Sequence, residues 1–345
     1  MATMRGAVLY EIGGPLVIEE LSVPELAHGQ VLVKVMATGL CHKQLEEITG
    51  KRGEDPFLPH LLGHEGAGIV QEIGPGVTCV QPGDHVVLGW MKGGGINSET
   101  PTYRTGDRTI NAGWIATFGE LIVVSENRVT PMDPAMPFDA AALLGCAVTT
   151  GVGAVRRIAG VTTGSTVAVF GMGGIGLSAV LGAASCRAGM IVAVDISAEK
   201  LELARDLGAT HTVDAAAGDA VAAVAEIAGA AGVDYGFEAA GNARVMEQAY
   251  RATGPQGTTV LMGVPAVEDT ICIDPLPLYL GQRLTGCHGG DTVRDEDIPQ
   301  YVQAYLAGEL KLDRLITRRL RLDEINDGFE EMRAKRLIGR ALIEF

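Results

Sequence analysis

Hydrophobic residues follow two different patterns along the 345-residue chain, and the pattern changes near residue 150. Before that point, short alternating or β-branched runs, such as Val31–Val35, Gly68–Ile73 and His85–Leu88, are separated by glycine and proline turns. Runs of this length joined by tight turns are typical of an antiparallel, β-rich domain. The polar, glycine-rich segment from Lys92 to Gly113 is predicted to be an irregular loop.

From about Thr150 onward, alanine-rich helical stretches alternate with short apolar runs. The four clearest runs are Val167–Phe170, Ile191–Val194, Tyr235–Glu238 and Thr259–Met262. This alternation predicts βαβ units and a parallel, doubly wound α/β sheet of the Rossmann type. We place this domain at residues 148–287, inserted into a β-rich catalytic domain made of residues 1–147 and 288–345.

The first strand of the second region runs into the glycine-rich turn Gly171-Met-Gly-Gly-Ile-Gly176. Its first glycine allows the sharp turn, its second lets a pyrophosphate approach the backbone, and its last lets the following helix pack closely on the strand. The free N–H groups at the helix start would meet the phosphate charge. The residues expected to contact a dinucleotide here are Gly171, Gly173, Gly174, Ile175 and Gly176.

An acidic residue, Asp195, ends the next strand, 19 residues beyond Gly176. A carboxylate at this place would accept hydrogen bonds from the adenosine ribose hydroxyls and repel a 2′-phosphate. The turn and the acid together predict a dinucleotide site that favours NAD over NADP.

Two thiols and one imidazole precede the glycine turn and form a suitable ligand set for a catalytic zinc ion. They stand in Gly39-Leu-Cys41, Gly63-His64-Glu65 and Gly145-Cys146. The fourth position would be left for water, substrate or Glu65. Each residue alone is weak evidence, since a cysteine such as Cys146 in an apolar run is more often a core thiol. The prediction rests on the order and context of the set.

Composition narrows the choice of partners and compartment. A net charge of −15 argues against nucleic acid or an anionic membrane surface as a partner. A hydrophobic content of 47% with 20% charged residues is ordinary for a globular enzyme. No apolar run reaches the length of a membrane span, and no apolar signal core follows the first residues, so we expect a cytoplasmic protein.

These motifs together resemble the zinc-dependent medium-chain alcohol dehydrogenase family over nearly the whole chain, most of all its glutathione-dependent formaldehyde and liver-type members. The resemblance implies a GroES-like catalytic domain around the Rossmann domain. It implies zinc held by Cys41, His64 and Cys146, with Glu65 a neighbour that can exchange onto the metal. Family members are dimers or tetramers, so a homodimer or homotetramer is expected.

The resemblance also implies cofactor contacts outside the glycine turn. It places His42 and Arg340 on the pyrophosphate, Thr150 beside the nicotinamide, and Lys200 with Asp195 around the adenosine ribose. Val264, in the matching Met262–Pro265 stretch, is a further expected cofactor contact.

The chain departs from the family pattern at two places, and each changes which family properties we expect of it. The family's second, structural zinc uses four closely spaced cysteines, whereas this chain has none between Cys79 and Cys146, so we expect that zinc to be absent.

The second departure lies just after Cys41. The family's hydroxyl relay is replaced by Lys43 and Glu46, and its usual supporting acid by Gln44. Lys43 either relays a proton or binds an anionic or polyhydroxylated substrate, or it pairs with Glu46 and points to solvent. By resemblance, Trp90, Trp114 and His288 join Lys43 and Glu46 as candidate pocket residues.

The predicted activity is a zinc-dependent transfer of hydride between NAD(H) and an alcohol, aldehyde or ketone. The polar candidate pocket favours a polyol, a sugar-derived or another functionalised alcohol. One alternative is a zinc-independent NAD(P)H reductase of activated C=C bonds, of the quinone or enoyl reductase type, with Lys43 as proton donor. A second alternative is a dinucleotide-binding protein without turnover.

Overall fold

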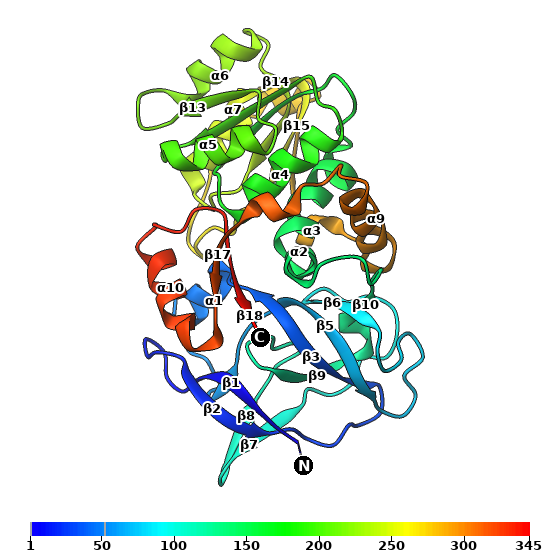
Figure 1. Ribbon diagram of the computed structural model, residues 1–345. Coiled ribbons are helices and arrows are strands. Elements are labelled where there is room, and N and C mark those ends of the chain that lie inside the picture. Colours follow the sequence, from blue (N-terminus) through cyan, green and yellow to red (C-terminus); the bar gives the residue numbers. More distant parts are fainter. Residues whose placement is uncertain (1, 52) are drawn as a thin grey trace. The chain divides into compact units, whose positions relative to one another are not determined.

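A computed structural model describes residues 2–51 and 53–345 (Figure 1). The chain divides into two compact units. Unit 1 contains the residues up to Cys146 together with Val293–Ala307 and Ile316–Phe345. Unit 2 contains Ala147–Thr292 and Gly308–Leu315. The middle of the chain thus forms its own unit, and both ends of the chain build the other.

Unit 1 is built from two β-structures. Five strands close into a barrel in the order β1-β2-β7-β8-β4, and a second sheet has the order β10-β6-β5-β3-β18-β17, with β9 also pairing with β3. The strands are β1 Thr3–Leu9, β2 Val17–Ser22, β3 Gln30–Gly39, β4 His60–Leu61, β5 Glu65–Ile73, β6 His85–Gly89, β7 Thr102–Thr105, β8 Arg108–Asn111, β9 Leu121–Ser125, β10 Val129–Pro131, β17 Ile316–Leu320 and β18 Arg340–Glu344. The last strand, β18, pairs antiparallel with β3 and so ties the chain end to the strand that precedes Cys41.

Short helices complete unit 1. They are α1 His42–Ile48, α2 Phe138–Ala142, α9 Arg294–Leu306 and α10 Ile325–Arg333. Helices α1 and α10 pack against each other, and their apolar faces share one core cluster that includes Leu45, Ile48, Ile325 and Phe329. This cluster fixes α1, which begins directly after Cys41.

The expectation of an irregular loop from Lys92 to Gly113 is partly wrong. Thr102–Thr105 and Arg108–Asn111 pair antiparallel as a hairpin that belongs to the barrel. A Gly106-Asp107 turn joins the two strands, and the one apolar residue of each strand, Tyr103 or Ile110, is fully buried in the barrel core. The many polar side chains belong to the outer face of the hairpin.

Unit 2 holds a six-stranded, wholly parallel sheet of order β13-β12-β11-β14-β15-β16. Its strands are β11 Thr166–Phe170, β12 Met190–Asp195, β13 His211–Asp214, β14 Val233–Glu238, β15 Thr253–Leu261 and β16 Arg283–Gly286. The order reverses direction between β11 and β14, which is the switch point where open α/β sheets bind their ligands. The predicted Rossmann-type, doubly wound fold is confirmed.

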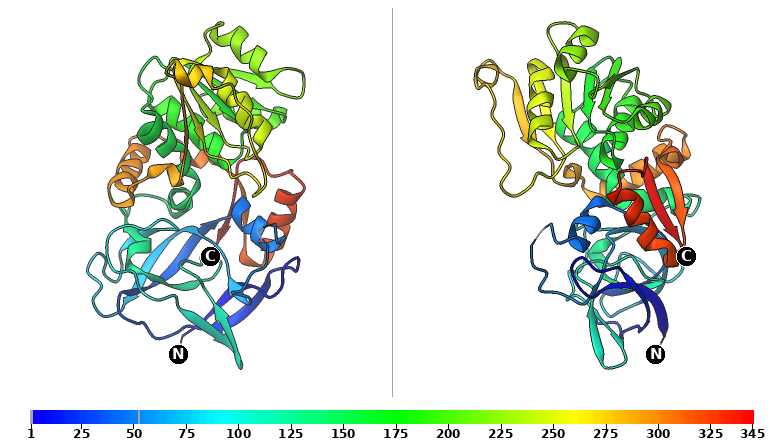
Figure 2. Two further views of the ribbon diagram at one scale, coloured as in Figure 1. Left: turned by 180° about the vertical axis from the view of Figure 1, so that it is seen from behind. Right: turned by 90° about the vertical axis from the view of Figure 1, so that its left-hand side faces the viewer.

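The helices of unit 2 lie on the two faces of this sheet (Figure 2). They are α3 Ala147–Gly153, α4 Gly174–Ser185, α5 Ala198–Asp206, α6 Ala220–Ala228, α7 Ala243–Ala252 and α8 Leu276–Tyr279, with a π-helical turn at Ala154–Ala159. Side-chain caps start three of them, since Ser197, Asp219 and Asn242 accept hydrogen bonds from the first-turn N–H groups of α5, α6 and α7. Among the described residues, no single helix is long and apolar enough to cross a membrane. The bent pair Phe138–Gly145 and Ala147–Ala159 reaches that length and apolar composition only when its two helices are taken together.

Buried charged groups of unit 1 hold the segments on both sides of β6. The Glu126 carboxylate accepts hydrogen bonds from the backbone N–H groups of Thr78 at 2.6 Å, Cys79 at 2.9 Å and Ile96 at 2.8 Å. Burial raises the pKa of Glu126, but hydrogen bonds from these three N–H groups lower it by more, so its pKa is about 2. Glu126 therefore stays ionised and joins three chain segments.

A second buried group acts from α9. The Arg294 guanidinium, 1% exposed, donates to the carbonyl oxygens of Val87 and Gly89 in β6 and of Met91 just after it. Next to it, the Asp295 carboxylate accepts from the N–H of Gly94 at 2.6 Å. Charged side chains thus stabilise backbone in a loop that contains no cysteine.

We predict that Glu126→Gln lowers the free energy of unfolding by about 2 kcal/mol at pH 7, because an NH2 group would face a backbone donor. The loss should shrink as the pH falls from about 4.5 towards 2. The wild-type carboxylate is then protonated, and the stability that its lowered pKa supplies is lost. Urea unfolding at several pH values, with the exposed Glu99→Gln as control, measures this. A loss that stays constant down to pH 2 would contradict it.

Candidate metal centre and dinucleotide site

Three separate segments of unit 1 deliver the two thiols and the imidazole. Cys41 is the N-cap of α1, directly after β3, with an extended backbone. His64 precedes the first residue of β5, and Cys146 follows the turn Leu143–Gly145. Because β3 and β5 are neighbours in the same sheet, Cys41 and His64 arrive at one end of that sheet.

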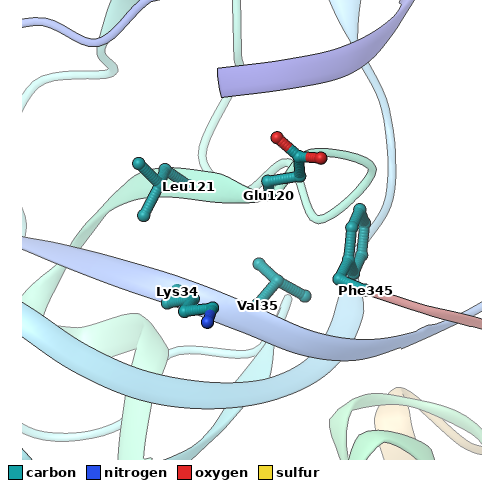
Figure 3. Close-up of a pocket in the computed structure, with 5 residues that line it drawn as sticks. All are labelled: Lys34, Val35, Glu120, Leu121 and Phe345. Carbon is teal, nitrogen blue, oxygen red and sulfur yellow. The ribbon is translucent and has the colours of Figure 1, made fainter. Parts of the chain in front are cut away.

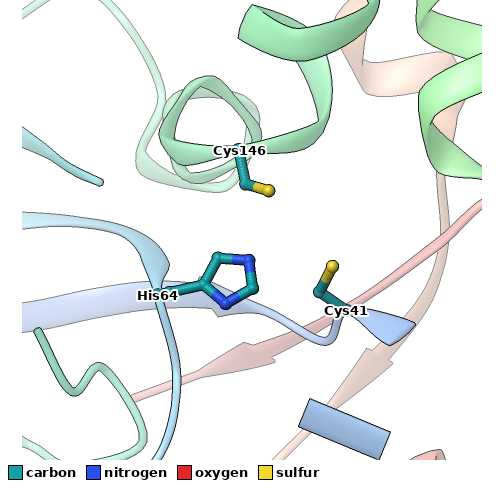
Figure 4. Close-up of side chains that lie close together, drawn as sticks. All are labelled: Cys41, His64 and Cys146. Carbon is teal, nitrogen blue, oxygen red and sulfur yellow. The ribbon is translucent and has the colours of Figure 1, made fainter. Parts of the chain in front are cut away.

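The structure brings these three side chains together. One ligand atom from each of Cys41, His64 and Cys146 lies within 4.8 Å of the other two (Figure 4). The sulfur atoms and one edge of the imidazole ring point toward a common centre. Two thiols and an imidazole at this spacing match the donor set of a three-ligand zinc site. Among the residues that the structure describes, this is the one group of at least three cysteine, histidine or acidic side chains with that geometry.

The pKa values of the two thiols are shifted in opposite directions. A hydrogen bond with Cys146 lowers the pKa of Cys41, and nearby His64 and Arg340 lower it further, so that it falls well below its usual value despite burial. The same hydrogen bond, together with burial, raises the pKa of Cys146, although the Trp90 side chain donates to its sulfur and opposes the rise. The hydrogen bond between the two thiols therefore makes Cys41 the stronger acid of the pair.

His64 is held by its second nitrogen. Its Nδ1 is hydrogen-bonded to the side-chain amide nitrogen of Gln44, whereas its Nε2 is buried and has no hydrogen-bond partner in the described chain. Buried polar atoms without partners are rare in folded proteins. An unpartnered imidazole nitrogen beside two thiols fits a metal ligand.

Glu65 and Arg340 form a buried ion pair next to this cluster. Glu65 is fully buried, Arg340 is 6% exposed, and their charged groups are in direct contact. A Cβ atom at Gly39 would lie 2.5 Å from the Glu65 carboxylate, so the glycine before Cys41 gives this side chain its space. Arg340, predicted to bind the cofactor pyrophosphate, thus has an anionic partner within unit 1.

The two charged residues that replace the family's relay are paired with other residues of the same region. Lys43 forms an ion pair with Glu47, not with Glu46, one helical turn along α1. Glu46 bonds to Lys51 with a 3.2 Å separation. Both pairs are partly exposed, and the structure leaves the predicted functional role of Lys43 a prediction.

The glycine turn lies in unit 2 between β11 and α4, at the switch point of the sheet. Gly171 has a φ of +95°, which permits the sharp turn. A Cβ atom at Gly176 would lie 1.8 Å from the carbonyl oxygen of Gly171, whereas one at Gly173 would meet nothing within 4 Å. Helix α4 has no side-chain cap, so its first N–H groups are available to an anion. These features fit a bound pyrophosphate.

Asp195, at the end of β12, helps to shape this turn. Its carboxylate accepts a hydrogen bond from the Met172 N–H at 2.6 Å and another from Ser197 N–H at 2.9 Å. Ser197 in turn caps α5 at the backbone N–H of Lys200. The acid predicted to bind the ribose is therefore held rigidly beside the glycine turn.

The remaining predicted residues are distributed over both units. In unit 2, Thr150 lies buried in α3, Val264 is 62% exposed after β15, and His288 precedes the turn Gly289–Asp291. In unit 1, His42 is the first residue of α1, Trp90 follows β6, and Trp114 is 70% exposed beneath the guanidinium of Arg128. Exposure excludes a core role for Trp114.

A separate cavity of about 320 Å³ lies elsewhere in unit 1 (Figure 3). Its lining residues are Lys34, Val35, Glu120, Leu121 and Phe345. It shares no residue with the cysteine–histidine cluster.

Sequence reasoning missed several residues that hold these sites. Glu238, fully buried at the end of β14, accepts hydrogen bonds from the N–H groups of Ala240 at 2.8 Å and Gly241 at 2.7 Å. Burial raises its pKa and these donors oppose the rise. The available signal was an acid at the carboxyl end of a buried strand, the same signal that identified Asp195. No comparable signal marked Glu126 or Arg294.

Comparisons with known proteins identify relatives of the whole chain and of its two domains. Residues 27–134 match the alcohol dehydrogenase GroES-like domain, and residues 174–307 match the zinc-binding dehydrogenase domain. The chain is 36% identical to an S-(hydroxymethyl)glutathione dehydrogenase of Synechocystis sp., covering 95% of this chain and 96% of that protein. It is 35% identical to a class-3 alcohol dehydrogenase of Cereibacter sphaeroides, covering 98% and 99%. The crystal structure of benzyl alcohol dehydrogenase from Acinetobacter calcoaceticus matches with a TM-score of 0.90 and 32% identity, covering 100% of both chains.

A GroES-like unit with a cysteine–histidine cluster and a Rossmann unit define a zinc-binding dehydrogenase. The chain belongs to the zinc-dependent medium-chain alcohol dehydrogenase family. Its class is confirmed as an alcohol dehydrogenase that uses zinc and NAD, and the two alternative functions are not supported.

Proposed function

We propose that one catalytic zinc ion is held by Cys41, His64 and Cys146, and that the chain carries no second, structural zinc. The observation that supports this proposal most is the convergence of the three ligand atoms within 4.8 Å, with the buried Nε2 of His64 unpartnered. Glu65, next in sequence to His64, is the acidic neighbour that can join the metal. Its ion pair with Arg340 neutralises its charge while it is not a metal ligand.

The bound zinc would supply Lewis acidity to the substrate oxygen, and the bound NAD would accept or return the hydride. The chain itself binds and orients the two partners. The glycine turn and the start of α4 would hold the pyrophosphate, and Asp195 would hold the ribose. By family resemblance, His42, Thr150, Lys200, Val264 and Arg340 complete the cofactor contacts.

The substrate we propose is a small alcohol or carbonyl compound that carries further polar groups, such as a polyol or a sugar-derived alcohol. The support is the charged pair Lys43–Glu47 near the start of α1, at a position where the family has a small hydroxyl side chain. A lysine can donate three hydrogen bonds to hydroxyl or anionic oxygens of a substrate. Kinetic comparison of aliphatic alcohols with polyols tests this, and a preference for unsubstituted aliphatic alcohols would contradict it.

We predict that the purified chain binds one zinc ion, and that Cys41→Ala or His64→Ala weakens zinc binding by roughly 100-fold or more, since even outer-shell substitutions cost 10–100-fold. NAD-linked alcohol oxidation should be lost in both variants. Metal analysis and activity assays measure this, with the exposed Cys272→Ala as the matched control that keeps both properties. Two zinc ions per chain, or unchanged zinc binding in both variants, would contradict the proposal.

We propose that Asp195 makes the enzyme prefer NAD, and predict that Asp195→Asn lowers the NAD/NADP ratio of kcat/KM by about tenfold, the equivalent of about 1.4 kcal/mol of charge repulsion. Asparagine removes the charge but keeps an acceptor for the Met172 N–H. Asp195→Ala should lower the same ratio and also reduce stability, because that acceptor is lost. An unchanged ratio in Asp195→Asn would refute the role of the charge.

We also propose that unit 2 pairs with a second copy of this chain along the edge strand β16. Three of this strand's four residues are exposed, and nearby Leu276, Tyr279 and Leu280 are 57%, 86% and 57% exposed. Edge strands with exposed apolar neighbours favour pairing with another chain. Light scattering should give a dimer or tetramer for the wild type and a smaller species for Tyr279→Glu/Leu280→Glu. A monomeric wild type at micromolar concentration would exclude this.

A further inference from the structure

Gln44 contacts two of the three proposed zinc ligands at once. It lies in the first turn of α1 and is 1% exposed. Its side-chain oxygen accepts a hydrogen bond from the Cys41 N–H at 3.1 Å, and its side-chain nitrogen is hydrogen-bonded to Nδ1 of His64. Among the described residues, the group that holds Nδ1 of the imidazole is therefore a neutral amide.

The chemistry of an amide fixes the proton on His64 in the metal-free protein. With the amide oxygen on the Cys41 N–H, the NH2 group faces Nδ1 of His64 and can only donate to it, so Nδ1 accepts and the neutral ring carries its proton on Nε2. Nε2 is the buried nitrogen without a partner, and Figure 4 shows one ring edge directed at the two sulfur atoms. A metal ion would need the lone pair of Nε2, and the ring proton would then move to Nδ1.

With a metal ion bound, two N–H groups would compete for the single side-chain oxygen of Gln44. In the metal-bound tautomer, Nδ1–H of His64 and N–H of Cys41 both donate, but the amide offers a single oxygen. If the amide turns its oxygen to His64, its NH2 group faces the Cys41 N–H and the cap of α1 loses its acceptor. If the amide does not turn, its NH2 group faces the Nδ1–H.

We propose that Gln44 is a positioning residue that sets how tightly the metal centre holds zinc, because metal binding sets two donors against its one oxygen. This inference rests on the proposed zinc site. A carboxylate of the same length has an acceptor at each end and would satisfy both donors together. The chain therefore holds a zinc ion that exchanges more readily than a carboxylate at position 44 would allow.

The experiment compares zinc-loaded wild type, Gln44→Glu and Gln44→Met. Zinc transfer to an excess of a chromogenic chelator should be about tenfold slower in Gln44→Glu and about tenfold faster in Gln44→Met, the lower end of effects typical for groups behind a ligand histidine. Thr49→Ala is the matched control. It removes a 2.7 Å hydrogen bond from the C-cap residue of α1 to the Leu45 carbonyl oxygen without touching a ligand, and should release zinc at the wild-type rate.

The imidazole proton gives a second readout that a merely structural role would not move. In ¹⁵N-histidine NMR, His64 of the metal-free wild type should carry its proton on Nε2 and shift it to Nδ1 on zinc loading. In Gln44→Glu, the proton should be on Nδ1 in both states. His64→Ala identifies the signal among the seven histidines of the chain.

Several results would overturn the inference. Zinc release from Gln44→Glu at or above the wild-type rate would do so, and so would release from Gln44→Met at the wild-type rate. Equal acceleration in Thr49→Ala and Gln44→Met would show a general effect of α1. In the NMR experiment, a proton already on Nδ1 of His64 in the metal-free wild type would also overturn it. If Gln44→Glu does not fold, Gln44→Met and the wild-type NMR spectra decide. Zinc binding that survives Cys41→Ala and His64→Ala would instead refute the proposed zinc site, and this inference with it.

Discussion

Compensation of buried negative charge is the constraint on which unit 1 depends. Glu65 is fully buried and Cys146 is 8% exposed, and a buried anion without a partner costs several kcal/mol. Arg340 neutralises Glu65, and a divalent cation would neutralise the two thiolates. The last strand therefore has a role beyond packing, because its pairing with β3 delivers Arg340 to the cluster.

The same principle explains the segment that follows β6. The family commonly uses four thiolates and a zinc ion near this place, by the resemblance described above, and this chain has no cysteine there. Glu126, Arg294 and Asp295 bind backbone N–H and carbonyl groups of the segment instead. Charge-assisted hydrogen bonds to backbone are roughly twice as strong as neutral ones. They stabilise the irregular segment that follows β6.

Much of the fold and the site could be predicted from the sequence, because each rests on local patterns. The runs Val167–Phe170 and Ile191–Val194 lie in strands β11 and β12, and the glycine turn lies between β11 and α4. The cluster of Cys41, His64 and Cys146 also forms as expected. Each of these features is marked by residue types within a short stretch.

The features that sequence analysis missed depend on contacts between distant residues. The hairpin Thr102–Asn111 was hidden by its polar outer face, because only Tyr103 and Ile110 point into the barrel. Glu126 binds residues up to 48 positions away, and Arg294 binds β6 more than 200 positions away. The partner of Lys43 is Glu47 and not Glu46, a difference of one residue that helical spacing alone could not decide.

In the proposed metal centre, two thiolates and one imidazole of unit 1 hold a single zinc ion. X-ray absorption at the zinc edge, on the purified chain, measures the ligand set most directly. The proposed ligand set predicts two sulfur neighbours at about 2.3 Å and one nitrogen at about 2.0 Å, with the remaining coordination by oxygen. Four sulfur neighbours, or a shell of nitrogen and oxygen without sulfur, would contradict it.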